Sequence, residues 1–230
     1  MNQLSGFLNE VAGIIRTPGH TLGQLMEGKK WVPVFLLLAI AIGIFTYVSY
    51  PLQMARLSEN SQLAGQLSDE ELSYFIKHST VTRLMASVLA IFGLVVTLIF
   101  DAFFVYLFFG IGGSKGEYGN YFALVVNASV IDTFLPSALR TGTLLFNIDL
   151  ISFSKPALLF FPFDPGNLIY LILSRLDIFA VWYLVAIAAG IHVFSKMSFK
   201  KSIFISILYF LFKLVVGVAF SYLFFKIAYL

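Results

Sequence analysis

The chain has 230 residues, of which 59% are hydrophobic and 12% are charged, and its formal net charge is +3. The charged share is about half that of an average soluble domain, which indicates a membrane protein. The absence of cysteine excludes disulfides, thiolate nucleophiles and zinc–thiolate sites. The small and dispersed positive charge excludes the concentrated basic face that nucleic-acid binding requires.

Residues 1–30 are predicted to form a cytoplasmic amphipathic segment. Within it, residues 3–16 carry apolar side chains at helical spacing, with Glu10 and Arg16 on or near the opposite face. A helix of this length cannot span a bilayer, so it either lies in the membrane interface or packs on the rest of the protein. Pro18 is expected to begin a second short helix, because proline is tolerated at the first helical position.

Five later stretches are apolar and long enough to cross a membrane. Residues 84–109 hold a single charge and would form a helix of about 39 Å, longer than a hydrocarbon core of about 30 Å. We expect Pro51 to close the first stretch and Pro136 to kink the third. The sequence therefore predicts an all-α fold, a polytopic membrane helical bundle over residues 31–230. The predicted transmembrane helices are residues 31–50, 84–109, 118–146, 168–195 and 203–225.

Two connections between these stretches have a distinctive composition. Residues 52–80 are polar, and Ser68 and Glu71 have the spacing of a capping box, which predicts the start of a helix. Residues 147–167 contain three prolines among several phenylalanines. This segment is too broken to span the membrane and too apolar for open water, so we expect an interfacial or re-entrant loop.

The distribution of lysine predicts the orientation of the bundle. If the N-terminus is cytoplasmic, Lys29 and Lys30 fall on the cytoplasmic side together with the group Lys196, Lys200 and Lys201. The totals of basic residues on the two sides are equal, so this prediction depends on clustering. We expect an integral protein of the bacterial cytoplasmic (inner) membrane, with the N-terminus in the cytoplasm and the C-terminus outside.

Three charged residues lie at a similar depth within the predicted spans. At 1.5 Å per residue, Asp101, Asp132 and Lys213 lie about 12, 16 and 15 Å from the cytoplasmic face. A charge at this depth is costly unless it is paired inside the bundle. We therefore expect Lys213 to contact Asp101 or Asp132.

A second charged layer lies nearer the outer face and contains Arg140, Arg175 and Asp177. Here we expect Arg140 to pair with Asp177 or its neighbour. Each polar cluster has two interpretations, a proton or ion relay and a structural contact between helices. The structural interpretation is favoured, because a lysine beside aspartates tends to neutralise the site.

The sequence contains no arrangement typical of an enzyme. We find no Ser/His/Asp order, no HExxH and no paired-carboxylate pattern, so we expect neither catalysis nor a metal or cofactor site. The glycine-rich run at residues 110–116 follows no predicted strand and lacks the full phosphate-loop spacing. It predicts a tight turn between two spans.

Three motifs resemble a known membrane protein family. Arg16-Thr17-Pro18 precedes a short helix, and Trp31 and Pro33 then open the first span. Residues 112–129 form a glycine turn that leads into an aromatic, alanine-rich span. Residues 176–179 contain Asp-x-Phe and are followed by a tryptophan and a glycine before a basic turn. With these motifs the chain resembles a prokaryotic-type member of the Yip family, the Ypt-interacting, Yip-domain integral membrane proteins.

This resemblance implies five spans with a cytoplasmic N-terminus and an external C-terminus. Eukaryotic relatives are associated with Rab-type GTPases and vesicle traffic. By analogy, the family motif falls on Gly112, Gly113, Asp177, Trp182 and Gly190.

The sequence is compatible with two functions. The leading hypothesis is a non-enzymatic membrane organiser or adapter that binds protein or lipid partners through residues 1–30 and the turns around Lys115 and Lys196–Lys201. The alternative is a small ion or solute transporter or channel that uses the layer of Asp101, Asp132 and Lys213. A water-filled cavity that reaches this layer would favour transport, and a dry, packed interior would favour the organiser.

The expected partners are the lipid bilayer and a membrane or cytoplasmic protein, and nucleic acid is excluded. The sequence is also compatible with a homo-oligomer. Five spans are few for one subunit of a transporter built from inverted repeats, so the transporter alternative would require several copies.

Overall fold

The computed structural model describes residues 2–59, 79–146 and 167–228. These residues form α-helices and one π-helical turn, and they contain no strand. Five of the helical segments are long and apolar enough to cross a membrane. The predicted all-α membrane bundle is therefore confirmed. The helix start expected at Ser68 and the loop expected at residues 147–166 lie outside the described residues.

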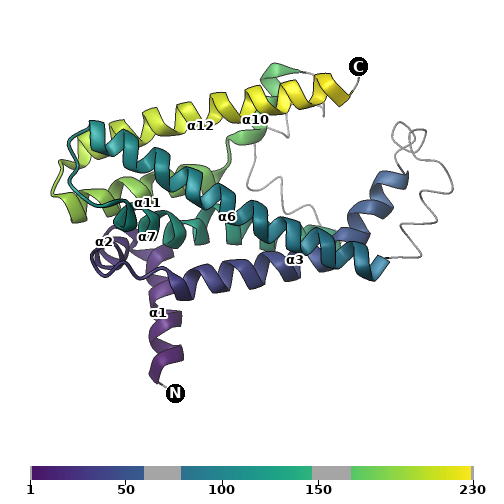
Figure 1. Cartoon of the computed structure of the whole chain (residues 1–230), viewed down its shortest axis with the longest axis horizontal. Helices are drawn as coiled ribbons and strands as arrows, with labels where there is room; N and C mark the ends of the chain where they lie inside the picture. Colours follow the sequence, from purple (N-terminus) through teal and green to yellow (C-terminus); the bar gives the residue numbers. More distant parts are fainter. Residues whose placement is uncertain (1, 60–78, 147–166, 229–230) are drawn as a thin grey trace.

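Figure 1 shows the long helices running side by side along the length of the molecule. In chain order the elements are α1 (Asn2–Arg16), α2 (Pro18–Glu27), α3 (Val32–Glu59), α6 (Ser79–Ile111), α7 (Tyr118–Ser129), the π-helical turn η1 (Val130–Phe134), α8 (Leu135–Phe146), α10 (Leu168–Arg175), α11 (Ile178–Ser195) and α12 (Phe199–Ala228). The candidate membrane spans are Val32–Gln53, Thr80–Ile111, Tyr118–Phe146, Ile178–Ser195 and Phe199–Leu223.

The first span differs from its prediction at its C-terminal end. Helix α3 continues through Pro51 to Glu59, so the expectation that this proline closes the helix is wrong. A proline inside a helix removes one backbone hydrogen bond, which neighbouring side chains in a membrane bundle can offset. Here Gln53 donates a side-chain hydrogen bond of 2.9 Å to the hydroxyl of Ser49, across the turn that contains the proline.

The third span contains a π-helical turn directly before Pro136. In η1 the backbone N–H of Leu135 donates to the carbonyl of Val130, five residues earlier. An α-helical hydrogen bond joins residues four apart, so a π-helical turn contains one more residue and is wider. Such turns occur frequently at functional sites. Asp132 lies in the middle of η1, so the irregular backbone sets the position of a buried carboxylate.

The fourth predicted span, residues 168–195, is two helices rather than one. Helix α10 ends at Arg175 and α11 begins at Ile178. Asp177 causes this break by capping α11, since its Oδ1 accepts a hydrogen bond of 2.6 Å from the backbone N–H of Ala180. Only α11 is long enough to cross the membrane.

The two N-terminal helices have different surroundings. Helix α2 packs against α7 and α11, and its Leu22 and Met26 are fully buried. Helix α1 instead stands out from the bundle, across the direction of the long helices (Figure 1). The C-terminal part of α1 nevertheless packs on the bundle, because Ile14 is fully buried in the core, so α1 projects from the protein only toward its N-terminus.

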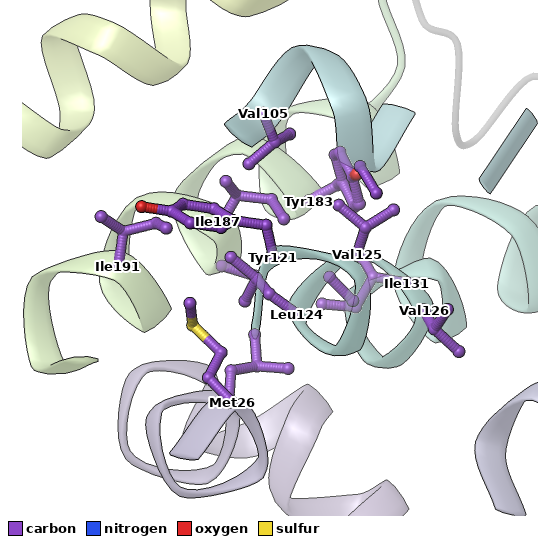
Figure 2. Close-up of a cluster of buried hydrophobic side chains, with 14 of the residues drawn as sticks. Met26, Val105, Tyr121, Leu124, Val125, Val126, Ile131, Tyr183, Ile187 and Ile191 are labelled. Carbon is purple, nitrogen blue, oxygen red and sulfur yellow. The ribbon is translucent and has the colours of Figure 1, made fainter. Parts of the chain in front are cut away.

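The apolar core lies where α2, α7 and α11 meet. Figure 2 shows Met26, Leu124, Ile187 and Ile191 converging there from these three helices. Tyr121 lies in the same cluster, with its hydroxyl donating to Ser114 at 2.8 Å. This core holds α11 in place, and the opposite side of α11 faces α12.

Candidate functional site: a cavity beside a charge cluster

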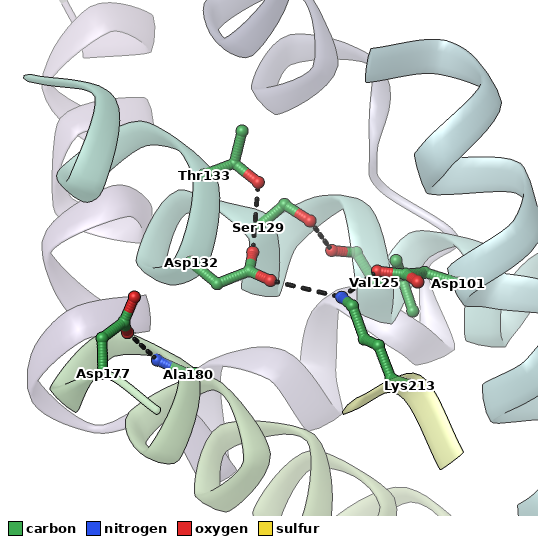
Figure 3. A network of polar contacts seen from close by, with 8 residues as sticks. All are labelled: Asp101, Val125, Ser129, Asp132, Thr133, Asp177, Ala180 and Lys213. Carbon is green, nitrogen blue, oxygen red and sulfur yellow. Dashed lines mark hydrogen bonds and ion pairs between the residues drawn. The ribbon is translucent and has the colours of Figure 1, made fainter. Parts of the chain in front are cut away.

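Three charged residues from three elements meet inside the bundle. The ammonium of Lys213 on α12 lies 2.5 Å from Asp101 Oδ2 on α6 and 3.7 Å from Asp132 Oδ2 in η1. Figure 3 shows the lysine reaching between the two aspartates. The contact expected from the similar depths of these residues is therefore present. We call these three residues the charge cluster.

Further contacts orient the charge cluster. Thr133 donates its hydroxyl to Asp132 Oδ1 at 3.2 Å. The Lys213 ammonium also lies 5.3 Å from the ring centroid of Tyr183, which is a cation–π contact. The side chains of Asp101 and Asp132 are 14% and 18% exposed, so both carboxylates are largely withdrawn from the surface.

A cavity of about 120 Å³ lies beside the charge cluster. It extends from the break between α10 and α11 to the middle of α12. Its lining residues are Asp132, Arg175, Asp177, Ala180, Tyr183, Leu184, Ile187, Ser206, Tyr209, Phe210, Lys213 and Leu214. About 10–15 Å³ of such volume holds one water molecule, so several waters fit.

Three hydroxyl groups on the wall of this cavity are unsatisfied. Those of Tyr183, Ser206 and Tyr209 are buried and have no hydrogen-bond partner within the described ranges. The Tyr183 and Tyr209 hydroxyls lie near each other, and the Tyr209 hydroxyl also lies near Asp101, in weak hydrogen-bonding contacts that fall short of full hydrogen-bond geometry. Because an unpaired buried hydroxyl costs about 1–3 kcal/mol, these groups favour water in the cavity.

The net charge of the site follows from its composition. With all groups ionised, Asp101 and Asp132 carry two negative charges and Lys213 carries one positive charge. The charge cluster therefore has an excess of one negative charge. Such a site can hold a proton or another small cation, and it disfavours an anion.

The second predicted cluster does not form. In the described part of the chain, Arg140 donates to Gln53 Oε1 at 3.4 Å, and no ion pair joins it to Asp177. Arg175 donates to Ser221 at 2.7 Å and to the carbonyl of Gly217 at 3.3 Å. The expected pair is wrong because Asp177 caps α11, whereas Arg140 on α8 contacts α3.

Most of the family-motif positions have architectural roles. Gly113 adopts a left-handed backbone conformation, with φ of +84°, in the turn between α6 and α7. A Cβ on Gly112 would lie 2.3 Å from Ile205 Cδ1, and one on Gly190 would lie 2.7 Å from Leu124 Cδ1. Asp177 caps α11, as described above. The side chain of Trp182 is 40% exposed and lies on the outer surface.

A polar contact joins α2 to α7 outside the spans. Lys29 donates to Glu117 Oε2 at 2.5 Å, and both side chains are exposed. The hydrogen bond and the positive charge of Lys29 lower the pKa of the Glu117 carboxyl. This pair lies where the glycine turn enters α7.

The sequence interpretation missed the hydroxyl groups of the cavity. Ser206 and Tyr209 precede Lys213 by seven and four residues, which places all three on one face of α12. This spacing was the available signal. Tyr183 lies on another helix, so only the tertiary structure brings it to the same wall.

The comparisons with known proteins support the resemblance found from the motifs. A family model, the Yip1 domain, matches residues 12–221, which is nearly the whole chain. The comparison with curated proteins gave no match. The comparison with solved structures gave none either.

Proposed function

We propose that this chain, which belongs to the Yip1 domain family, is a non-enzymatic integral membrane protein that transfers a small cation through the cavity beside Asp101, Asp132 and Lys213. The observation that carries the proposal is the cavity itself, because it reaches a buried site with one excess negative charge. A purely structural ion pair needs no adjoining cavity with unpaired hydroxyls.

Within this site Asp132 is the group that exchanges the cation. Lys213 holds Asp101 at 2.5 Å, whereas its distance to Asp132 is 3.7 Å. Because the attraction between two charges weakens with distance, Lys213 stabilises the Asp132 carboxylate less than it stabilises the Asp101 carboxylate. Asp132 also lines the cavity, so its carboxylate can reach a cation that enters there.

The test uses the purified full chain in liposomes that contain a pH-sensitive dye. Proton flux is driven by a potassium diffusion potential, and opposing gradients of sodium or potassium are then tested in the same vesicles. We expect flux above that of protein-free liposomes, and we expect Asp132→Asn to abolish it.

The control variant for this test is Ser129→Ala. Ser129 lies one turn before Asp132 and donates its hydroxyl to the Val125 carbonyl at 2.8 Å, outside the cavity. We expect this variant to retain the flux. Equal flux in Asp132→Asn and the original protein, or no flux above protein-free liposomes, would reject the transport function.

The organiser hypothesis keeps one specific observation in its favour. Helix α1 projects from the bundle toward its N-terminus (Figure 1), where a partner or a lipid surface has access to it. The orientation proposed for this role places the N-terminus in the cytoplasm, because the lysines of the two clusters lie at the same end of the bundle.

Deletion of residues 1–16 tests the organiser hypothesis. The deletion should abolish binding of a protein or lipid partner and leave membrane insertion intact, because all five candidate spans begin at Val32 or later. Mass spectrometry of proteins and lipids copurified with the intact and shortened chains provides the measurement. An identical set in both preparations would contradict the organiser role.

A further inference from the structure

A row of hydroxyl groups leads along α12 to the charge cluster. Ser202, Ser206 and Tyr209 precede Lys213 at intervals of four, three and four residues. At 3.6 residues per turn this spacing places all four side chains on one face of the helix. The row rises about 16 Å, from the first turn of α12 to the lysine.

Among the described residues, the Ser202 and Ser206 hydroxyls have no hydrogen-bond partner, and the Tyr209 hydroxyl has only weak contacts with Tyr183 and Asp101 that fall short of full hydrogen-bond geometry. Ser202 and Ser206 are fully buried, and Tyr209 is 3% exposed. Buried serines in two other helices bond back to a carbonyl four residues earlier, as Ser129 does to Val125 and Ser87 does to Arg83. The hydroxyls of the α12 row do not use this local acceptor.

The row is continuous with the cavity. Ser206, Tyr209 and Lys213 line it on α12, and Tyr183 lines it on α11. Ser202 lies beyond the cavity, four residues or about 6 Å of helical rise from Ser206, a separation that one bridging water molecule would span. A chain of water molecules along this row would satisfy every unpaired hydroxyl in it.

We propose that the row Ser202–Ser206–Tyr209, with Tyr183 opposite, holds a water chain that carries protons between the end of the bundle near Lys200 and Lys201 and the aspartates of the charge cluster. This inference rests on the proposed transport function and names the proton as the cation. Each transfer breaks one O–H bond and forms another. The last transfer leaves a neutral carboxylic acid on Asp132, and Lys213 keeps its charge throughout.

The water chain can be tested without any transport assay. X-ray radiolysis of water, followed by mass spectrometry, labels side chains that lie beside bound water even when they are buried. Tyr121 is the matched control, because it is fully buried and its hydroxyl is already bonded to Ser114. We expect label on Tyr183 and Tyr209 and none on Tyr121, and equal labelling of the three tyrosines would overturn the water chain.

The proton path is tested by flux in the dye-loaded liposomes. Ser206→Ala and Tyr209→Phe each remove one hydroxyl and little volume, so the fold should persist, as circular dichroism would check. We expect each to lower proton flux several-fold and to abolish the radiolytic label nearby, whereas Ser129→Ala changes neither. Normal flux in both hydroxyl variants, with Asp132→Asn inactive, would reject the path and leave the transport function standing.

A different failure is also informative. Labelled Tyr183 and Tyr209 in a protein without flux of any cation would reject both the transport function and the proton-carrying role of the water. Flux of sodium or potassium alone would reject the proton path and retain the transport function.

Discussion

The two sides of α11 are packed in opposite ways. Toward α2 and α7, Ile191 is fully buried, and Gly190 lets the helices approach so closely that an added Cβ would overlap Leu124. Toward α12, Tyr183 borders a cavity and leaves its hydroxyl unpaired. One helix therefore separates a packed apolar core from a cavity that borders the charge cluster.

Polar groups on the packed side find partners in the protein. Asn120 donates to the Met26 carbonyl at 2.9 Å, and Asn127 donates to the Lys30 and Ala123 carbonyls at 2.7 Å. The exception is the side-chain oxygen of Asn127, which accepts no hydrogen bond from the described residues. On the cavity side, the hydroxyls of Tyr183, Ser206 and Tyr209 make no hydrogen bond of full geometry with the described residues. Each such group costs about 1–3 kcal/mol, so this side is not arranged for stability alone. This difference between the two sides supports the proposal that the charge cluster has a function besides helix packing.

The largest expected effect comes from removing the positive charge on the cavity side. Lys213→Met leaves two aspartates unpaired inside the bundle, and the free energy of unfolding should fall by about 3–5 kcal/mol. Titration with sodium dodecyl sulfate in mixed micelles measures this change. The triple variant Asp101→Asn, Asp132→Asn, Lys213→Met should recover most of the stability, because no charge is left unpaired. Unchanged stability in Lys213→Met would mean that the cluster is fully solvated, and the contrast between the two sides would disappear.

An intermediate effect is expected on the packed side. Gly190→Ala places a methyl group 2.7 Å from Leu124 Cδ1 and 3.1 Å from Leu22 Cβ. Such overpacking should lower the free energy of unfolding by about 1–3 kcal/mol in the same titration. The matched control is Gly93→Ala in α6, where nothing lies within 4 Å of the added Cβ. The control should be neutral or slightly stabilising because alanine favours helix, and equal effects of the two variants would show that this interface is loose.

The smallest effect is expected outside both sides, at the exposed pair of Lys29 and Glu117. Because the folded protein lowers the pKa of Glu117, the pair stabilises the fold above the ordinary value of 4.5 and loses this contribution as the pH falls through the lowered pKa. Glu117→Gln should therefore be slightly less stable than the original protein at neutral pH. The two should become equal in acid, as unfolding titrations at several pH values would measure. A difference that stays constant with pH would remove the ion pair as its cause.

The spacing of charges along the sequence predicted part of the site correctly. Asp101, Asp132 and Lys213 lie at similar depths in three spans, and helical rise alone was sufficient to bring them to one layer. The same argument failed for Arg140 and Asp177. The depth of a residue in the membrane does not determine the direction of its side chain. The Asp177 carboxylate instead accepts a hydrogen bond from the nearby backbone N–H of Ala180.

Local irregularities in the backbone were harder to predict. Pro136 indicated a disturbance in the third span, but the π-helical turn that carries Asp132 lies before it. The break before α11 was missed because residues 168–195 are almost continuously apolar, and one capping aspartate decides where the new helix starts.

The sequence by itself determined that the chain is a helical membrane protein with five apolar spans, because length and hydropathy act within each segment separately. It also determined the family, through motifs that mostly serve turns, caps and close helix contacts. Only the tertiary structure decided that α2 belongs to the core and that Tyr183 faces the hydroxyl row of α12 across a cavity. The physical reason is that the rotation of each helix about its axis is set by side-chain packing between segments distant in the chain, which no single segment specifies.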